Sequence, residues 1–542
     1  MWIDEQTRSQ LHLEEILADF EPLTPYGKKE RKNLKPFLPG EEERWLWMLN
    51  EQEKLQSVGR TFSEEFHKLE RICKQFPDIT SILELLSQSR TPALTDWFHL
   101  KRFLWLIQEW MELLSKHERL TSFLLSKEEI EIVNRLLWRL NPSPSLQPSF
   151  AVEDAYDERL KNARKRLRQL EVQKQKEREE SIQQLESKYN IRPNRLGEWV
   201  IDRKAPVHRE LEGESQITLI RETMYEKVYE LSRPNLEQAQ EDELKQQIEE
   251  RVQLILQQLA HQFMPHLSEI QQIVEKLTHF DLLWARVRLA TTWNGVKPEW
   301  DVDHFVLDQG VHPVVERYLH QKELSFTPID LHIYQGVSVI IGPNMGGKTV
   351  AIKTVGMITA LAQLGFFVPA TRCRMPLFPW IATVIGDDQQ VEKGLSSFGA
   401  EVIRLGTWLE KKKQQGLLLL DEIGRGTNPI EGASLSFAIT DYLSRSQIWT
   451  LHVTHYQELM SLKHIQVFRV AGLPEEVYLY PIEKDPKAWI SLLHQRMDYR
   501  LVPVKEQDQF PEQAISIAKM LGLHADIVKQ AQQLVKSKRG EE

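Results

Sequence analysis

One stretch of the sequence has the residue types and the spacing of a phosphate-binding loop. It reads Gly-Pro-Asn-Met-Gly-Gly-Lys-Thr and fits the pattern G-x-x-x-x-G-K-[ST]. Glycines let backbone N–H groups turn toward a phosphate, lysine neutralises the β- and γ-phosphates, and a threonine hydroxyl ligates Mg²⁺. An ordinary glycine turn is the alternative. We expect a nucleotide site formed by Gly342, Pro343, Asn344, Met345, Gly346, Gly347, Lys348 and Thr349, with Thr349 on the metal.

A second set of polar residues follows a run of four leucines. Residues 417–420 are typical of a buried central strand, and Asp421 and Glu422 come directly after them. Successive strand residues point to opposite sides, so Asp421 can face Mg²⁺ while Glu422 faces a water molecule aimed at the γ-phosphate. His455 follows another apolar run and can sense the γ-phosphate. A salt bridge at the strand end and a structural histidine are the alternatives.

The elements that must position these residues differ along the chain. After residue 300, short apolar runs at 337–341, 416–420, 448–453 and 477–481 alternate with helical stretches such as 350–364. This alternation predicts an α/β domain with a largely parallel sheet. Before residue 140, apolar side chains recur at spacings of three and four, as in 11–20 and 97–113, which predicts helices interrupted by Pro/Gly turns at 22–27 and 35–40.

Between these parts, residues 152–190 and 241–289 are rich in charged residues or glutamine and have a leucine periodicity. They predict two long helices packed as an antiparallel arm, with a short strand-like stretch at 199–208 between them. The predicted fold is therefore multidomain: an all-α helical core and lever with a long helical arm, followed by an α/β phosphate-loop domain. The expected limits are 1–150 for the core, 151–298 for the arm and 299–542 for the α/β domain.

Composition limits the class of protein. The 542 residues are 41% hydrophobic and 27% charged, as in folded globular proteins. No apolar run approaches the roughly 18 residues that span a bilayer, and the start lacks the order of a signal peptide, so we expect a cytoplasmic protein. The two cysteines, Cys73 and Cys373, lie far apart and have no partners at metal-ligand spacing, which argues against a disulfide framework and a zinc site.

The charge pattern bears on nucleic acid. The net charge is −9, which is unfavourable for binding a polyanion over a large surface, and about −7 of it lies in residues 1–300. One basic cluster on the first arm helix could still contact a duplex backbone, and ion pairing with neighbouring glutamates is the alternative. The candidate residues for this contact are Lys161, Arg164, Lys165 and Arg168, with Arg166 in the same cluster.

These motifs resemble the MutS family of ABC-type ATPases, strongly over residues 300–542 and more loosely before them. The matching stretches are 310–316, 341–349, 385–389, 395–398, 421–427 and 454–456. The resemblance implies a Mg²⁺-dependent ATPase with catalytic roles for Glu422, His455 and Gln389. It also implies a homodimer in which Ser396 and Ser397 of one subunit reach the γ-phosphate held by the other, and a C-terminal helical dimerisation segment at 514–523.

Departures from the family pattern leave the partner open. We expect no mismatch-reading domain in the N-terminal part, the nuclease motif Leu-Asp-Leu-His-Gly is not found in the sequence, and Glu512 stands where MutS2 relatives usually have serine. One hypothesis is an ATP-switched DNA clamp related to mismatch repair. The other is an ATP-dependent reactivating factor for an adenosylcobalamin-dependent aminomutase, because residues 22–27 and 35–42 resemble segments of such factors. The acidic first half favours the protein partner, and the family favours DNA.

Overall fold

The computed structural model describes residues 2–142, 149–232, 235–342, 347–386, 397–425, 427–472, 496–504 and 523–539, with Ile515 and Ala518. The chain forms two compact units. One contains Met1–Glu70, His117–Ser122 and Leu277–Glu542, and the other contains Arg71–Lys116 and Phe123–Lys276. Each unit joins segments that are distant in sequence, so these limits differ from a linear division at residues 150 and 298. That division stays a prediction about functional domains.

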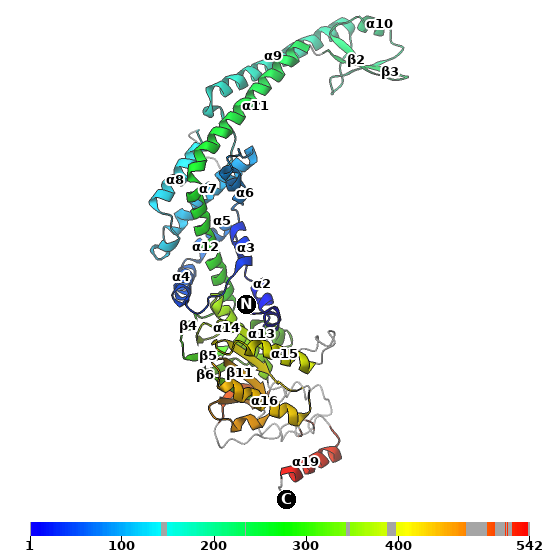
Figure 1. Cartoon of the computed structure of the whole chain (residues 1–542). Coiled ribbons are helices and arrows are strands. Elements are labelled where there is room, and N and C mark those ends of the chain that lie inside the picture. Colours follow the sequence, from blue (N-terminus) through cyan, green and yellow to red (C-terminus); the bar gives the residue numbers. More distant parts are fainter. Residues whose placement is uncertain are drawn as a thin grey trace. The chain divides into compact units, whose positions relative to one another are not determined.

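The first unit contains a six-stranded sheet with the order β13-β12-β7-β11-β10-β9. Figure 1 labels its central strand β11. Its pairs are parallel except for the antiparallel pair β12–β13. This agrees with the largely parallel sheet predicted from the sequence, although the predicted strand at 477–481 lies outside the described residues. The strands are β7 (Val337–Ile341), β9 (Ile381–Ile385), β10 (Leu417–Asp421), β11 (Trp449–Thr454), β12 (Gln466–Gly472) and β13 (Asp498–Pro503).

Helices pack on both faces of this sheet because its central strands are apolar on both sides. Leu418 and Leu420 of β10 lie in a buried cluster with Leu405 and Trp408. On the opposite face, Gly356 lies so close to Leu419 that an added Cβ would approach its side chain to 2.5 Å. The helices concerned are α14 (Lys348–Gln363), α15 (Ser397–Leu409) and α16 (Pro429–Ser444).

A second sheet of the first unit has the order β4-β8-β5-β6. Its strands are β4 (Glu299–Trp300), β5 (His304–Gly310), β6 (Ile329–Tyr334) and β8 (Arg372–Met375), and α13 (Pro313–Gln321) follows β5. The C-terminal helix α19 covers Ala525–Arg539.

The N-terminal helices are shorter than predicted. The periodic stretch at 11–20 contains only α2 (Leu13–Ala18), which follows α1 (Glu5–Gln10), because His12 adopts a left-handed φ of 53° that ends helical continuity. The turn predicted at 22–27 contains the start of α3 (Pro25–Glu30), with Thr24 as N-cap and Pro25 in the first turn. Helices α4 (Glu42–Thr61) and α5 (Ser63–Cys73) follow.

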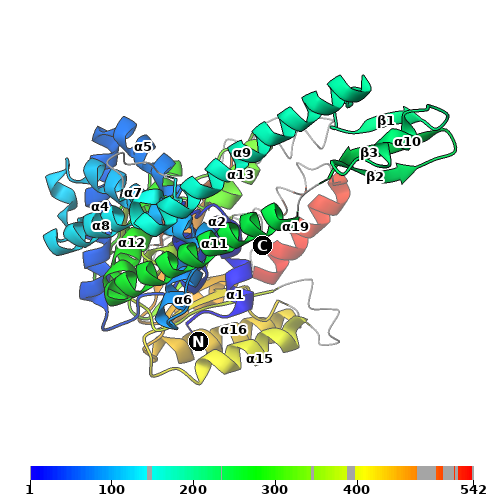
Figure 2. The same cartoon turned by 90° about the horizontal axis from the view of Figure 1, so that it is seen from above.

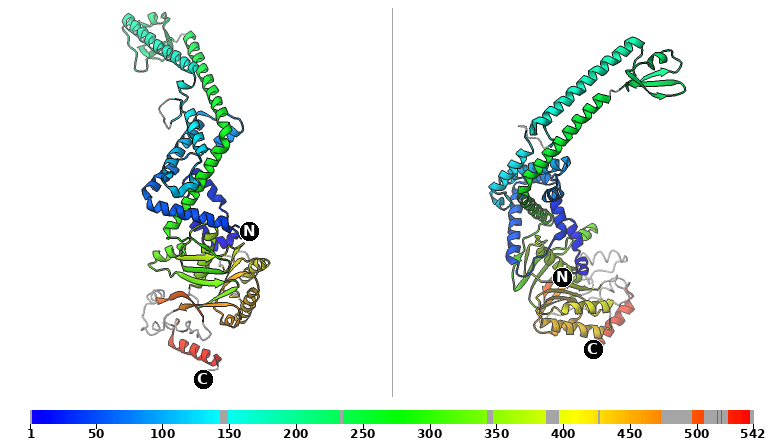
Figure 3. Two further views of the ribbon diagram at one scale, coloured as in Figure 1. Left: turned by 90° about the vertical axis from the view of Figure 1, so that its left-hand side faces the viewer. Right: turned by 45° about the horizontal axis from the view of Figure 1, so that its top comes forward.

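The second unit is mainly helical, and α9 (Glu158–Tyr189) lies beside α11 (Asn235–Phe263), as Figure 3 shows from two sides. Lys174 and Glu241 join these two helices by an ion pair of 2.6 Å. The predicted continuous helix at 241–289 is interrupted by a 3₁₀ turn at Met264–His266, where Pro265 lacks an N–H donor. The other helices are α6 (Thr80–Ser87), α7 (Leu94–Leu114), α8 (Lys127–Arg139) and α12 (Leu267–Thr292), of which α12 continues into the first unit.

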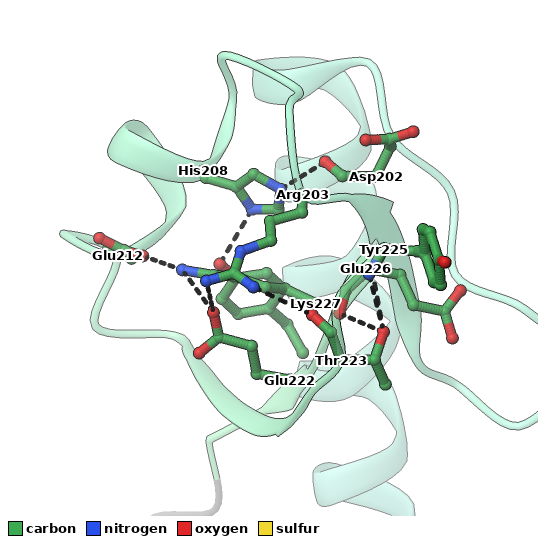
Figure 4. Close-up of polar contacts among 10 residues, drawn as sticks. Asp202, Arg203, His208, Glu212, Glu222, Thr223, Tyr225, Glu226 and Lys227 are labelled. Carbon is green, nitrogen blue, oxygen red and sulfur yellow. Dashed lines mark hydrogen bonds and ion pairs between the residues drawn. The ribbon is translucent and has the colours of Figure 1, made fainter.

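The strand-like stretch at 199–208 belongs to a small antiparallel sheet, so this part of the chain is not all-α. The order is β1-β3-β2, with β1 (Trp199–Asp202), β2 (Ile217–Glu222), β3 (Glu226–Leu231) and the short helix α10 (His208–Leu211). Figure 4 shows its polar contacts: His208 bonds to the Asp202 carbonyl at 2.6 Å, and Lys227 pairs with Glu212 at 2.7 Å. Throughout the described ranges, no helix combines the length and the apolar character needed to cross a membrane.

Candidate nucleotide site

The predicted phosphate loop connects β7 to α14, as the motif requires. Pro343, Asn344, Met345 and Gly346 lie outside the described residues, whereas Gly342 and Gly347 are described. Gly347 has a φ of +73°, and an added Cβ would lie 2.8 Å from the Tyr499 ring, so only glycine fits. Lys348 and Thr349 then occupy the first turn of a 16-residue helix, where the helix dipole favours an anion.

Thr349 and Asp421 meet at the carboxyl end of β10. The Thr349 hydroxyl donates a hydrogen bond of 2.6 Å to Asp421 Oδ2. Asp421 Oδ1 is buried and has no hydrogen-bond partner in the described part of the chain. Burial raises the pKa of Asp421, the Thr349 hydrogen bond opposes this, and the charge of Glu422 adds to it. A hydroxyl beside a carboxylate with an unused oxygen fits a divalent cation.

The same pair cannot hold a cation by itself. Among the described residues there is no group of three or more His, Cys, Asp and Glu side chains that could bind a metal ion. Mg²⁺ in nucleotide sites is normally bound by one or two protein groups together with phosphate oxygens and water. Thr349 and Asp421 therefore fit a cation that binds together with a nucleotide.

Glu422 is held in an unusual backbone conformation. Its φ is +48°, a left-handed value that costs a non-glycine residue about 1–3 kcal/mol and is typical of functional sites. Its N–H donates to the Val453 carbonyl at 2.8 Å. Strand alternation was expected to place Asp421 and Glu422 on opposite sides of β10. In the structure β10 ends at Asp421, and the left-handed turn directs Glu422 instead.

Two cations and a histidine surround the Glu422 carboxylate. Lys348 Nζ lies 3.3 Å from Oε1, His455 Nδ1 lies 3.8 Å from the same oxygen, and an Arg425 guanidinium nitrogen lies 3.2 Å from Oε2. The interaction with His455 and the charge of Lys348 lower the pKa of Glu422 to about 2, although burial acts in the opposite direction. Glu422 is therefore ionised at neutral pH.

Lys348 is positioned by groups that a phosphate can replace. Its ammonium donates to the Gly342 carbonyl at 2.9 Å and pairs with Glu422. Burial lowers the pKa of Lys348, and the charge of Glu422 opposes that effect. The structure thus brings together Lys348, Thr349, Asp421, Glu422 and His455. Gln389 and Ser396 lie outside the described residues, and Ser397 begins α15 without a described side chain.

A pocket next to Gly347 was not found from the sequence. Its volume is about 460 Å³, and its lining includes Leu319, Phe326, Val350 and Tyr499. The lining comes from three segments distant in sequence, so no local motif indicates it. Its apolar and aromatic side chains at the start of α14 suit a flat ring system attached to the phosphates.

The basic cluster on α9 is partly neutralised. Lys161 pairs with Glu158 at 3.1 Å, Arg164 pairs with Asp154 at 2.8 Å, and Arg168 lies 3.9 Å from Asp154. Arg164 also donates to the Val152 carbonyl, so its position is structurally constrained. Lys165 and Arg166 are exposed and form no ion pair with any described residue. A nucleic-acid contact by this cluster stays a prediction.

Comparison with known families matches residues 338–538 to MutS domain V. Similar chains include the endonuclease MutS2 of Leuconostoc mesenteroides, 36% identical over 209 residues, which are 38% of this chain and 26% of that protein. The DNA mismatch repair protein MutS of Petrotoga mobilis is 33% identical over 226 residues, covering 40% and 27%. The protein of the same name from Thermus aquaticus is 30% identical over 289 residues, covering 53% and 32%.

The family match spans the end of β7, α14, both catalytic carboxylate candidates and His455, so it includes the residues that the structure brings together. Residues 338–538 of this chain therefore resemble MutS domain V. The chain spans about a quarter to a third of the length of these curated relatives. The relatives carry MutS and MutS2 names, which give no support to an aminomutase partner.

Proposed function

We propose that this chain binds ATP together with Mg²⁺ and hydrolyses it to ADP and phosphate. The observation that carries the proposal is the 2.6 Å contact between Thr349 and Asp421, beside Lys348 and the ionised Glu422. A hydroxyl, two carboxylates and a lysine at a helix N-terminus are the groups that phosphoryl transfer from a nucleotide needs. The MutS domain V match supports the same activity.

Each described residue has a distinct role in this proposal. Lys348 binds the β- and γ-phosphates, and Thr349 and Asp421 hold Mg²⁺, which neutralises phosphate charge when bound. Glu422 orients a water molecule or takes its proton. His455, which lies beside Glu422, contacts the γ-phosphate. Phe326 and Tyr499 provide the faces against which the nucleobase packs.

ATP binding must rearrange the contacts of Lys348. Without a nucleotide, its ammonium is shared between the Gly342 carbonyl and Glu422. The phosphates compete for this ammonium, and Glu422 loses one of the cations that keep its pKa low. The pKa of Glu422 then rises toward its ordinary value, which makes the carboxylate a better proton acceptor once the substrate is in place.

The proposed assembly is a homodimer with shared ATP sites, in which Gln389, Ser396 and Ser397 complete the site. Beside His455, an open apolar hollow of about 660 Å³ lies along α16, and Ile430 at its rim is 78% exposed. Mixing Lys348→Ala chains with chains that carry Ser396→Ala and Ser397→Ala should restore one working site per heterodimer. Inactive heterodimers would contradict action across the interface.

The proposed partner is DNA, contacted through its backbone and gripped or released according to the nucleotide bound. Relatives at 30–36% identity are named as a DNA mismatch repair protein and an endonuclease, which supports a nucleic-acid partner. The exposed Lys165 and Arg166 on α9 are the described cations of the cluster that can reach phosphates without breaking an ion pair. The proposed role is a conformational switch related to mismatch repair.

Thr349→Val tests the ATPase proposal, because it removes the hydroxyl at nearly constant volume. Phosphate release should fall about 100-fold or more, and the remaining activity should need more Mg²⁺. Thr354→Val is the matched control, since this threonine lies on the same helix and bonds only to the Val350 carbonyl in the described part of the chain. Hydrolysis by Thr349→Val at the unmodified rate would contradict the assignment.

A further inference from the structure

The N-terminal segment covers the free edge of the six-stranded sheet. β9 is the last strand in the sheet order, so its outer backbone groups have no strand partner. The Ile381 N–H donates to the Trp2 carbonyl at 2.9 Å, and the Thr383 N–H donates to the Thr7 hydroxyl at 3.1 Å. Gln10 donates to the Ile385 carbonyl at 3.0 Å. Residues 2–10, including α1 in Figure 2, therefore close this edge.

One arginine of α15 joins that segment to the sheet. Arg404 is 14% exposed, and its Nε donates to the Thr383 carbonyl at 2.6 Å. Its terminal nitrogens donate to Gln6 at 2.6 Å, to Asp4 at 2.9 Å and to Thr7 at 2.8 Å. The planar guanidinium of Arg404, which α15 carries, thus donates hydrogen bonds to β9 and to the N-terminal segment at the same time.

Asp4 is held in its charged form by this arrangement. Burial alone would raise the pKa of Asp4, but hydrogen bonds from Thr7 and Arg404 outweigh it, and the pKa lies below its ordinary value. Asp4 is also the N-cap of α1, accepting from the Thr7 N–H at 2.7 Å. The contact is therefore a charge-assisted bond between two ordered groups, which is stronger than a neutral one.

The same face of α15, one turn earlier, reaches the nucleotide site. Glu401 lies one turn before Arg404, and a Cβ added to Gly386 would lie 2.9 Å from its carboxylate. Burial raises the pKa of Glu401, and a hydrogen bond from the Gly424 backbone opposes that effect. Gly424 belongs to the turn that follows Glu422. α15 therefore contacts the turn that follows Glu422 through Glu401, and the N-terminal segment through Arg404 one turn later.

We infer that Arg404 is a positioning residue for ATP hydrolysis, which fixes α15 against the nucleotide site by tying it to Asp4, Thr7 and the edge of β9. The N-terminal segment is then a part of the ATPase machinery rather than only a start of the helical region. The role rests on the proposed ATP hydrolysis and adds a residue to it. Lys348 and Thr349 lie on α14, so loss of Arg404 should affect turnover more than nucleotide binding.

The experiment compares Arg404→Gln with the unmodified full-length chain. Arg8→Gln is the matched control, because Arg8 lies on α1 but pairs with the exposed Glu14 at 2.7 Å and forms no hydrogen bond or ion pair with the described residues of α15. Turnover is measured as phosphate release per nucleotide-binding site, with sites counted by titration of bound ATP. Counting sites removes the effect of any misfolded fraction. Arg404→Gln should lower kcat about tenfold or more and change KM less than about threefold, and Arg8→Gln should change neither.

Asp4→Asn keeps the test valid if Arg404→Gln does not fold, since it removes one charge at constant shape. It should lower kcat about threefold, and the effects of the two variants should be less than additive, because they act on one contact. A kcat per site within twofold of the unmodified value for the folded variant would overturn the inference. If the unmodified chain itself hydrolyses no ATP, the proposed function fails and this role fails with it.

Discussion

Replacement of Glu422 by glutamine separates ATP binding from hydrolysis. The pKa of Glu422 falls from 4.5 to about 2, which corresponds to about 3 kcal/mol of charge stabilisation, of which about 1–2 kcal/mol remains after solvent screening of its exposed partners. His455 and Lys348 share this stabilisation. Removing the carboxylate charge therefore frees Lys348 for phosphate by about 1 kcal/mol, which predicts about fivefold tighter ATP binding.

Turnover should change in the opposite direction. Glutamine keeps the shape of the side chain but accepts no proton, so phosphate release should fall about 100-fold or more. Binding is measured by titration calorimetry with Mg²⁺ and ATP, and turnover by steady-state phosphate release. Glu458→Gln is the control, because this exposed carboxylate lies three residues beyond His455. Unchanged turnover, or weaker ATP binding with a folded protein, would refute the assigned role of Glu422.

Three further predictions concern packing, pH and nucleic acid. Gly432→Ala should destabilise the first unit by about 1–3 kcal/mol in urea unfolding and lower turnover. The added Cβ would lie 2.5 Å from the Tyr456 hydroxyl and 2.6 Å from the Gly424 carbonyl. Gly406→Ala is the control, because a Cβ at Gly406 meets no atom within 4 Å and should not destabilise the protein. Burial lowers the pKa of His452 from 6.5 to about 4. The unfolded chain protonates this histidine as the pH falls below about 6.5 and the folded chain does not, so His452 should lower the free energy of unfolding by about 1 kcal/mol between pH 7 and 5.5. His452→Gln should remove this contribution and leave the pH dependence due to other buried histidines such as His312, whose pKa is also lowered by burial. The double variant Lys165→Glu, Arg166→Glu should reduce the slope of log affinity for duplex DNA against log salt by about 2, because each lost phosphate contact removes about 0.9. Arg60→Glu on α4 is the control and should leave the slope unchanged. An unaltered slope in the double variant would exclude this cluster from the DNA contact.

Local sequence patterns predicted those parts of the site that are contiguous in the chain. The loop ending in Lys348 and Thr349 and the leucine run before Asp421 each carry their own signal, and the structure joins them through a hydrogen bond. The left-handed backbone of Glu422 could not be predicted, because local preference disfavours it and the surrounding turn imposes it. Its position beside Lys348 depends on that turn.

Contacts between distant segments were beyond sequence reasoning for a different reason. The pocket beside Gly347 combines Phe326 with Tyr499, and Arg404 bonds to Asp4 across 400 positions. Nothing in the periodicity of either segment identifies its partner, because such contacts are set by how the elements pack. The interruption between α11 and α12, by contrast, was readable at Pro265, where the missing N–H ends regular helix.

The most direct test of the central claim is ATP turnover by the purified chain with and without Mg²⁺, compared with Lys348→Ala. Lys348 is the described lysine at the start of α14 that contacts both Gly342 and Glu422. We expect repeated ATP turnover by the unmodified chain with Mg²⁺ and no turnover when Mg²⁺ is chelated. A folded Lys348→Ala variant should lose both ATP binding and hydrolysis. Hydrolysis that persists in Lys348→Ala, or an unmodified chain that neither binds nor hydrolyses ATP, would contradict it.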